Sequence, residues 1–478
     1  MATVSGCSKR ETSAPATPAA PEKILRVSQR NEPATLDPQL ATLPDEFFII
    51  RALGEGLLTP NPVGGAPLAG VAEKWEVSPD GLTYAFHLRA DAKWSNGDPV
   101  TADSFAAMIR RATAPGSIAP KAHLFAAVRE MKAPDPRTLV ISLKQRTADF
   151  PAIVASGPWI PAHEKPGIGN GPFVLSEWKP SQHIAVRKNS LYWDAARVKL
   201  DGIRFVAMDN GDSEERAFRA GQLDVTMAVP VTKIPGYRAA QPSVLRSVPL
   251  AETRYLALNT QRPPLNDPRV RQALALALDR TSLVEKVLQG GQQPAFHFVP
   301  AGLGDYAPGL RLTENAAQAR ELLAAAGFPG GKGFPRLELT AWPVSGGQLE
   351  AIQQMWRREL GIEVALAQRE ARTHLASLAA GDYAVAFMTA IPDCDGASDL
   401  FTQLTTGHAA NYPHWSNPEY DRLAAAAQWA PAEKILLGDM PLIPLYFNSQ
   451  NFLVAPRVKN WRADRLWTRF YRDVTVDR

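Results

Sequence analysis

The sequence is poor in the residues that build covalent or metal-based frameworks. Among 478 residues there are two cysteines, Cys7 and Cys394, and eight histidines. Two cysteines cannot supply a disulfide framework or a cysteine-based zinc cluster. None of the histidines forms an HExxH or HxH spacing. We therefore expect no bound metal and no cofactor.

The motifs of common enzyme classes and of membrane spans are missing as well. The chain has no Gly-x-Ser-x-Gly elbow and no phosphate-binding Walker A loop. Its serine, histidine and aspartate residues show no spacing that indicates a catalytic triad. There is also no run of about 18 apolar residues, the length that a transmembrane helix needs. We expect a protein that is not an enzyme.

An excess of charge of one sign is also absent. Lysine and arginine number 52 against 48 for aspartate and glutamate, and no dense basic stripe occurs. This excludes the electrostatic footprint of a nucleic-acid-binding protein. Hydrophobic residues make up 45% and charged residues 21% of the chain, which is typical of a globular protein of this length with about three domains. The 41 prolines are nearly twice the usual share of about 5% and argue against a helical bundle.

Hydrophobic periodicity predicts mixed strands and helices and no internal repeat. Strand-like alternation occurs at 24–29, in a hairpin within 71–94, and at 138–144. Helical periodicity occurs in several further segments, and strands are predicted between the later helices. The expected helices are 44–58, one opening at the N-cap Thr101, 268–289 after the N-cap Asp267, 315–326 and 347–360, and the strands between them are 336–342 and 362–368. The fold class is therefore α/β or α+β with several lobes.

The N-terminal segment resembles a bacterial lipoprotein signal. Val4-Ser5-Gly6-Cys7 matches a lipobox, in which small residues precede the cysteine that is lipidated. Residues 8–22 are rich in Ser, Thr, Ala and Pro, a composition typical of a flexible tether. The alternative is a chance cysteine in a flexible tail. We expect Cys7 to be lipidated in the native precursor, which would place the protein in the periplasm or at the cell surface as a membrane-anchored lipoprotein.

Ten short segments, in family order, resemble the solute-binding receptors of ABC importers for oligopeptides and dipeptides. Each segment is weakly specific alone, but their order along the chain is highly specific. They are EGLL at 55–58, LAGVAEKW at 68–75, DGLTY at 80–84, AKWSNGDPVTAD at 92–103, GNGPF at 169–173, GQLD at 221–224, LNT at 258–260, DPRVRQAL at 267–274, NPEYD at 417–421 and PLIPLY at 441–446. The resemblance covers about residues 24–478.

The resemblance implies a two-lobed periplasmic-binding-protein fold, the Venus flytrap, with an extra domain inserted into the first lobe. Such receptors close about a hinge when the ligand binds. The expected divisions are a tether at 1–23, lobe I at 24–65, 166–263 and 453–478, inserted domain II at 66–165, and lobe III at 264–452.

The resemblance also implies a ligand site. In the family an extended peptide lies between the lobes and forms strand-like hydrogen bonds, so any side chain is tolerated. An aspartate of the second lobe pairs with the peptide α-ammonium, and this role falls on Asp393. Thr389 and Ile391 would offer backbone groups, and from the first lobe Glu55, Gly56 and Leu57 would face the peptide.

The implied partners are a short peptide and the permease subunits of an ABC importer in the inner membrane, with the receptor itself a monomer. The function is capture of short peptides and their delivery to that permease. A receptor of the same fold for a non-peptide ligand, such as a nickel chelate, haem, a sugar or an opine, is the alternative.

Overall fold

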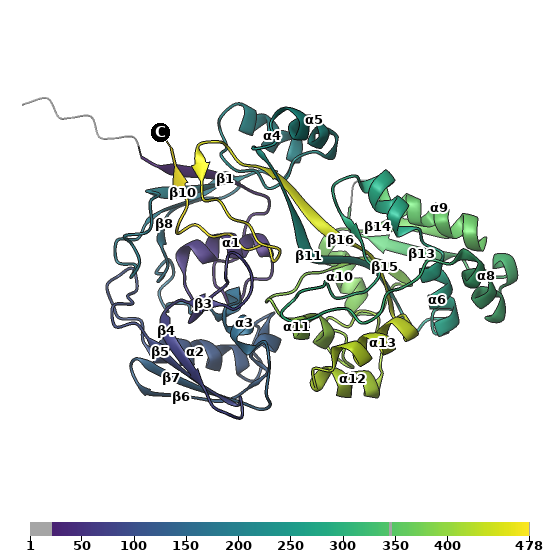
Figure 1. Cartoon of the computed structure of the whole chain (residues 1–478), viewed down its shortest axis with the longest axis horizontal. Helices are drawn as coiled ribbons and strands as arrows, with labels where there is room; N and C mark the ends of the chain where they lie inside the picture. Colours follow the sequence, from purple (N-terminus) through teal and green to yellow (C-terminus); the bar gives the residue numbers. More distant parts are fainter. Residues whose placement is uncertain (1–21, 344–346, 478) are drawn as a thin grey trace, which may run out of the picture.

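The computed structural model describes residues 22–343 and 347–477, so Cys7 and the rest of the predicted tether lie outside the described residues. Figure 1 shows two lobes side by side, joined by two long strands, with a smaller sheet domain below the first lobe. Within the described residues no helix has the length and apolar character that crossing a bilayer requires.

Lobe I is built on a four-stranded sheet in the order β1-β10-β9-β8. These strands are β1 (Ile24–Gln29), β8 (Phe173–Lys179), β9 (His183–Lys188) and β10 (Gly202–Ala207), and the helices of the lobe are α1 (Pro44–Leu53), α4 (Gly211–Arg219) and α5 (Ile234–Ala240). β1 confirms the strand predicted at 24–29. The C-terminal segment returns to this lobe, where Val474 and Val476 join a core that contains Leu25 and Phe205.

The inserted domain is a four-stranded antiparallel sheet covered by one helix. Its strands, in the order β4-β5-β7-β6, are β4 (Ala72–Val77), β5 (Thr83–Leu88), β6 (Val128–Asp135) and β7 (Thr138–Leu143), and α2 (Ala102–Thr113) packs on them. The predicted hairpin within 71–94 is confirmed as β4 and β5. Tyr84, Phe86 and Leu88 are buried at alternate positions of β5, as strand periodicity requires. Thr101 occupies the N-cap of α2, as predicted.

Lobe III is a mixed six-stranded sheet in the order β12-β16-β11-β15-β13-β14. Its strands are β11 (Leu245–Leu258), β12 (Gln293–Pro294), β13 (Leu337–Ala341), β14 (Val364–Gln368), β15 (Val385–Ala390) and β16 (Leu442–Leu453). Its helices are α6 (Pro268–Leu276), α7 (Arg280–Ser282), α8 (Ala316–Ala325), α9 (Gln348–Leu360), α10 (Ala371–Ala379), α11 (Ala397–Thr402), α12 (Pro418–Ala425) and α13 (Trp429–Asp439). The strands predicted at 336–342 and 362–368 are confirmed as β13 and β14.

The helical structure predicted over 268–289 is present, but it is interrupted between Leu276 and Arg280. Asp267 caps its first turn as expected, since its carboxylate accepts from the N–H of Arg269 at 2.9 Å. The helix ends at Leu276, and Asp279 caps a new start by accepting from the N–H of Ser282 at 2.8 Å. An aspartate that captures a backbone N–H in this way breaks a continuous helical ladder.

Strands β11 and β16 connect the two lobes. Val225, next to lobe I strand β1, bridges to Val454 beyond the end of β16. From Thr253 onwards β11 pairs with β15 inside lobe III. One continuous strand, β11, therefore contributes to both lobes. A register irregularity between Pro249 and Thr253 marks the place where the strand leaves lobe I.

Candidate ligand-binding site

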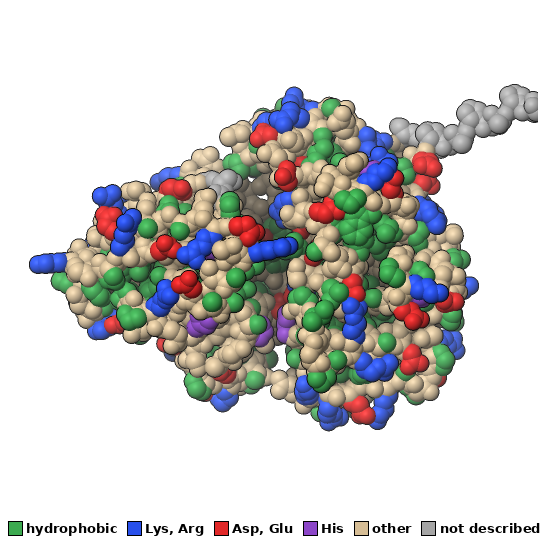
Figure 2. Space-filling model, turned by 180° about the vertical axis from the view of Figure 1, so that it is seen from behind, with side chains coloured by type: hydrophobic (Ala, Val, Ile, Leu, Met, Phe, Trp, Pro, Cys, Tyr) green, Lys and Arg blue, Asp and Glu red, His purple; other side chains and the backbone are tan. Residues whose placement is uncertain are grey.

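A cavity of about 1330 Å³ lies between the lobes. Lobe I contributes α1 to its wall, domain II contributes residues 120–123 and 155–158, and lobe III contributes the end of β15 with the loop that follows. The C-terminal residues 464–468 complete the lining. Figure 2 shows the hollow between the two halves of the molecule from behind, with histidine side chains beside it.

Strand β15 leaves part of one edge unpaired beside this cavity. On one side it pairs with β11 as far as Ala390, which lies opposite Thr253. On the other side, within the described residues, β13 pairs only with Val385 and Ala386. Thr389 and Ile391 lie beyond this point and line the cavity. An extended ligand could therefore add to the sheet at this edge, which is the arrangement that strand addition needs.

Asp393 also lines the cavity, but the structure gives its carboxylate a partner within the chain. The ammonium group of Lys121, from domain II, donates a hydrogen bond to Asp393 Oδ1. The other carboxylate oxygen lies 3.8 Å from His123 Nε2, and the Asp393 N–H donates to Asp399 Oδ2 at 2.6 Å. Burial raises the pKa of Asp393, although the charge of Lys121 acts in the opposite direction.

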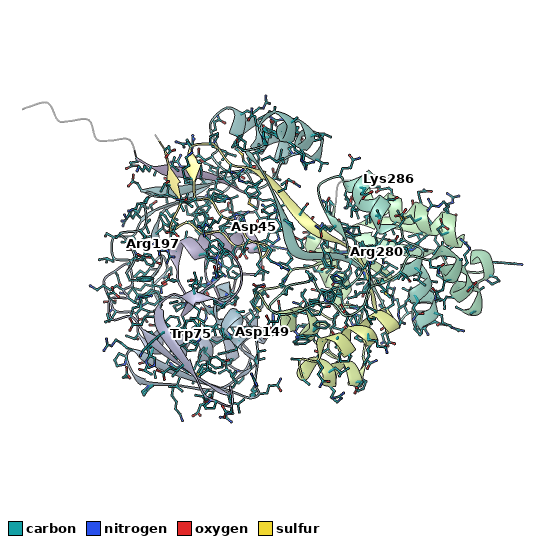
Figure 3. The ribbon with its side chains drawn as sticks, viewed as in Figure 1. Asp45, Trp75, Asp149, Arg197, Arg280 and Lys286 are labelled. Atoms are coloured by element: carbon teal, nitrogen blue, oxygen red, sulfur yellow. The ribbon has the colours of Figure 1, made fainter. Side chains whose placement is uncertain are left out.

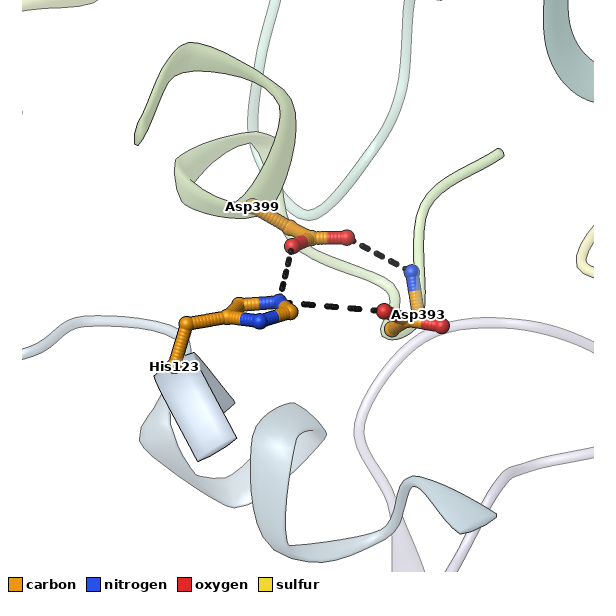
Figure 4. Close-up of side chains that lie close together, drawn as sticks. All are labelled: His123, Asp393 and Asp399. Atoms are coloured by element: carbon orange, nitrogen blue, oxygen red, sulfur yellow. Dashed lines mark hydrogen bonds and ion pairs between the residues drawn. The ribbon is translucent and has the colours of Figure 1, made fainter. Parts of the chain in front are cut away.

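Asp399 completes a group of four charged or ionisable side chains, of which Figure 4 shows His123, Asp393 and Asp399. Its Oδ1 lies 3.4 Å from His123 Nε2. Burial acts to raise the pKa of Asp399, but the bonds from His123 and from the Asp393 N–H outweigh it, so the pKa is lowered. Two basic side chains of domain II thus face two carboxylates of lobe III, an ion-pair network that holds the two parts together.

The same group is the place where a divalent cation could be held. One donor atom each from His123, Asp393 and Asp399 lies within 4.8 Å of the others. Imidazole and carboxylate are suitable ligands for zinc. However, the Lys121 ammonium already neutralises Asp393, and a second cation beside it would be repelled. The structure therefore favours the ion-pair network at this place.

A second contact between domain II and lobe III lies beside this network. Asp149, just before α3 (Phe150–Val154), accepts a hydrogen bond from Ser398 at the start of α11. Figure 3 shows Asp149 at the border between domain II and lobe III. Gly396 packs directly on the Asp149 side chain, so an added Cβ would lie 2.7 Å from Asp149 Cγ. The two parts are in close contact without a ligand between them at this point.

Glu55, Gly56 and Leu57 do not line the cavity. The Glu55 carboxylate is buried in lobe I, where it accepts from Tyr192 Oη at 2.7 Å and from Trp193 Nε1 at 2.6 Å. The carbonyls of Gly56 and Leu57 accept from N–H groups of residues 70–72. The structure therefore places this predicted segment outside the cavity, with its polar groups paired within the fold.

We expect Glu55→Gln to leave ligand affinity unchanged within about twofold and to alter stability in a pH-dependent way. Burial raises the pKa of Glu55, against the bonds from Trp193 and Tyr192 that lower it. A carboxyl whose pKa is raised in the folded state takes up a proton on folding. The wild type therefore loses this contribution to its stability as pH rises through the raised pKa of Glu55. The melting temperature of Glu55→Gln minus that of the wild type should therefore increase as the pH is raised from about 4 to about 8. A constant difference across this range would contradict the assignment.

Several residues of the cavity carried no signal in the sequence. Glu252 on β11 is buried and accepts from Thr389 Oγ1 at 3.0 Å and from Trp467 Nε1 at 3.0 Å. Glu252 also forms an ion pair with Arg254, whose Nη2 lies 2.6 Å from Glu252 Oε1. These partners are far apart in the sequence, so no local pattern could have linked them.

Comparison with known proteins places the chain in a family. The model of the bacterial extracellular solute-binding proteins, family 5, matches residues 66–412. The chain belongs to this family. Its α/β fold, with two lobes and a ligand cavity between them, is the fold of a family 5 solute-binding protein.

Two curated family 5 relatives match over nearly the whole chain. The periplasmic murein peptide-binding protein MppA of Escherichia coli is 31% identical, covering 90% of this chain and 89% of its own. The oligopeptide-binding protein OppA of Bacillus subtilis is 29% identical, covering 91% and 89%.

Solved structures of family 5 proteins superpose closely. The E. coli MppA structure has a TM-score of 0.87 at 30% identity, covering 96% of this chain and 99% of the other. Haemophilus influenzae OppA in complex with the peptide RPPGFSPFR has a TM-score of 0.83 at 26% identity, with the same coverage. The unliganded open form of MppA gives a lower TM-score of 0.75. The lobes of this protein are therefore arranged less like those of the open form.

Proposed function

We propose that this protein is the extracytoplasmic receptor of an ABC importer that captures short peptides and delivers them to the permease in the inner membrane. The observation that carries the proposal is the edge of β15 beyond Ala386, which has no strand partner among the described residues and which leads to Thr389 and, just past the strand, Ile391 at the cavity. A peptide backbone can add to such an edge whatever its side chains are. The relatives named as murein peptide-binding and oligopeptide-binding proteins support this ligand class.

The proposal includes a binding cycle without chemical turnover. The ligand would bridge Asp393 and the β15 edge in lobe III to the wall formed by lobe I and domain II. Because both walls must contact one ligand, closure about β11 and β16 would accompany binding. The receptor would act as a monomer, since each chain contains the complete cavity.

Mass spectrometry under native conditions tests the ligand class directly. Protein purified from cells without denaturation should carry short peptides, which acid release and sequencing would identify. A relative that is 31% identical is named as a probable deoxycholate-binding protein, so a non-peptide ligand is the competing outcome. Recovery of a single non-peptide compound would replace the peptide proposal and leave the receptor fold unaffected.

We further propose that the native precursor is anchored through lipid on Cys7, which would place the receptor at the outer face of a membrane. Two or three acyl chains hold a protein stably on a bilayer, whereas one chain gives only marginal binding. Expressed in its host with its export signal, the wild type should sediment with membranes, and Cys7→Ser should appear in the soluble fraction. Membrane association that survives Cys7→Ser would contradict the anchor.

A further inference from the structure

One arginine of the cavity wall has neither a paired carboxylate nor a full set of acceptors. Arg51, in the last turn of α1, lines the cavity, and its Nη2 donates to the carbonyl of Ala155 at 3.3 Å. Within the described residues this is its one side-chain hydrogen bond, and Asp464 acts on it only from a distance. Burial lowers the pKa of Arg51 to about 10, although the charge of Asp464 acts to raise it. The guanidinium is still a cation at neutral pH.

Three other cations of the cavity have a carboxylate partner, since Arg30 lies 4.0 Å from Asp45. Arg254 pairs with Glu252 at 2.6 Å, and Lys121 pairs with Asp393. Arg465 donates to the carbonyls of Ala301 and Gly302, at 2.8 and 3.4 Å. Arg51 differs from all of them because, in the described part of the chain, it has neither a carboxylate partner within ion-pair distance nor more than one side-chain hydrogen bond.

A buried hydroxyl lies beside Arg51 and is also without a partner. Ser156 follows Ala155 directly, lines the cavity and is only 3% exposed. Among the described residues, no group forms a hydrogen bond with its Oγ. A buried hydroxyl without a partner is costly and is usually satisfied by something that binds there.

Close packing holds these two groups on one wall. Phe47, one turn before Arg51 on α1, packs against Gly157, where an added Cβ would lie 2.5 Å from Phe47 Cε1. The absence of a side chain at Gly157 lets α1 approach the chain at Ser156. The wall at this place joins lobe I to domain II, opposite the lobe III strand that is proposed to bind the ligand backbone.

We propose that Arg51 and Ser156 form an anion subsite that binds a carboxylate of the captured ligand. The guanidinium offers two parallel N–H donors that match the two oxygens of a carboxylate. The hydroxyl offers a further donor to the same group. The carboxylate is the C-terminus of a peptide or an acidic side chain, so the inference rests on the proposed function and specifies its ligand.

The experiment compares a tryptic casein digest with the same digest after methyl esterification of its carboxyl groups. Wild-type protein should retain peptides from the untreated digest and about 10- to 100-fold less from the esterified one, as expected when one partner of a partly buried charge pair is lost. Arg51→Gln should reduce retention of the untreated digest by a similar factor and should no longer distinguish the two digests. Ser156→Ala should cause a smaller loss, of about two- to tenfold.

Two further variants separate the subsite from general effects on folding. Arg51→Lys keeps the charge but not the two parallel donors, so its affinity should lie between those of the wild type and Arg51→Gln. Arg465→Gln is the matched control, since it removes another arginine of the cavity that donates to two backbone carbonyls, and it should retain the preference for free carboxylates. Synthetic copies of the retained peptides, with the C-terminus amidated, distinguish a terminal carboxylate from an acidic side chain.

The outcomes are separable. Peptide retention that is insensitive to esterification and to Arg51→Gln would overturn the subsite while leaving peptide capture intact. Failure of the wild type to retain peptides from either digest would overturn the proposed function, and the subsite with it. Equal losses in Arg51→Gln and Arg465→Gln would mean that Arg51 acts only through the overall charge of the cavity.

Discussion

Asp393→Asn should weaken the binding of a peptide with a free α-ammonium group by about 30-fold to 3,000-fold. Removing one partner of a buried, hydrogen-bonded charge pair costs about 2–5 kcal/mol, much of it from the charge that is left unpaired, and each 1.4 kcal/mol is about tenfold in affinity. Asp393 lines the cavity at the end of the open β15 edge, where the N-terminus of an extended ligand would lie. Isothermal titration calorimetry with one of the peptides released from the native protein measures the effect.

Because Lys121 contacts Asp393, the effect of the mutation must be compared with the effect of changing the peptide. The Lys121 ammonium pairs with Asp393, so a ligand ammonium must share or replace it. N-acetylating the peptide removes the ligand charge and should weaken wild-type binding by a factor similar to that of Asp393→Asn. The two changes together should cost less than their sum, because they break one interaction. Lys121→Met removes the internal competitor and should strengthen binding of the free peptide but not of its acetylated form.

A different pattern would reassign Asp393. If N-acetylation has no effect on the wild type while Asp393→Asn still weakens binding, then Asp393 serves the ligand only by holding domain II through Lys121. Strictly additive losses would likewise mean that the aspartate and the ligand ammonium act at separate places.

Gly396→Ala should hold the lobes apart and weaken ligand binding by about 5- to 150-fold, the equivalent of an overpacking cost of about 1–3 kcal/mol. The new Cβ would lie 2.7 Å from both Cβ and Cγ of Asp149. Asp149 cannot rotate out of the way, because its own Cβ is among the clashing atoms. Gly396 has extended backbone angles, φ −151° and ψ 139°, so alanine is tolerated locally and separation of domain II from lobe III relieves the clash.

Small-angle X-ray scattering, combined with calorimetry, tests this result. The radius of gyration of Gly396→Ala should exceed that of the wild type, and saturating peptide should reduce the difference only in part. Gly438→Ala is the matched control, since Gly438 lies in α13 of the same lobe and an added Cβ there meets no atom within 4 Å. The double variant Gly396→Ala, Asp149→Gly should restore closure. A profile for Gly396→Ala identical to that of the wild type, with and without peptide, would show that this contact does not control closure.

The sequence by itself determined the local elements, and its resemblance to a known family implied the two-lobed architecture. Alternating residues predicted β1 and the β4–β5 hairpin, because each strand of these sheets buries one face. Thr101 and Asp267 correctly marked helix starts, since an N-cap acts on N–H groups within three residues of it. These features depend on neighbours in the chain, which a linear pattern records.

The tertiary structure alone decided which polar groups reach the ligand. Glu55 has the sequence context of a ligand contact, yet Tyr192 and Trp193 hold its carboxylate inside lobe I. The family resemblance predicted a ligand contact for Asp393, but the partner that the structure gives it, Lys121, lies 272 residues away in a different domain. Burial, pairing and the approach of two lobes arise from the packing of distant segments, and the free energy of each charged group depends on that packing. For this reason the fold could be predicted from the chain, whereas the charge balance of its cavity could not.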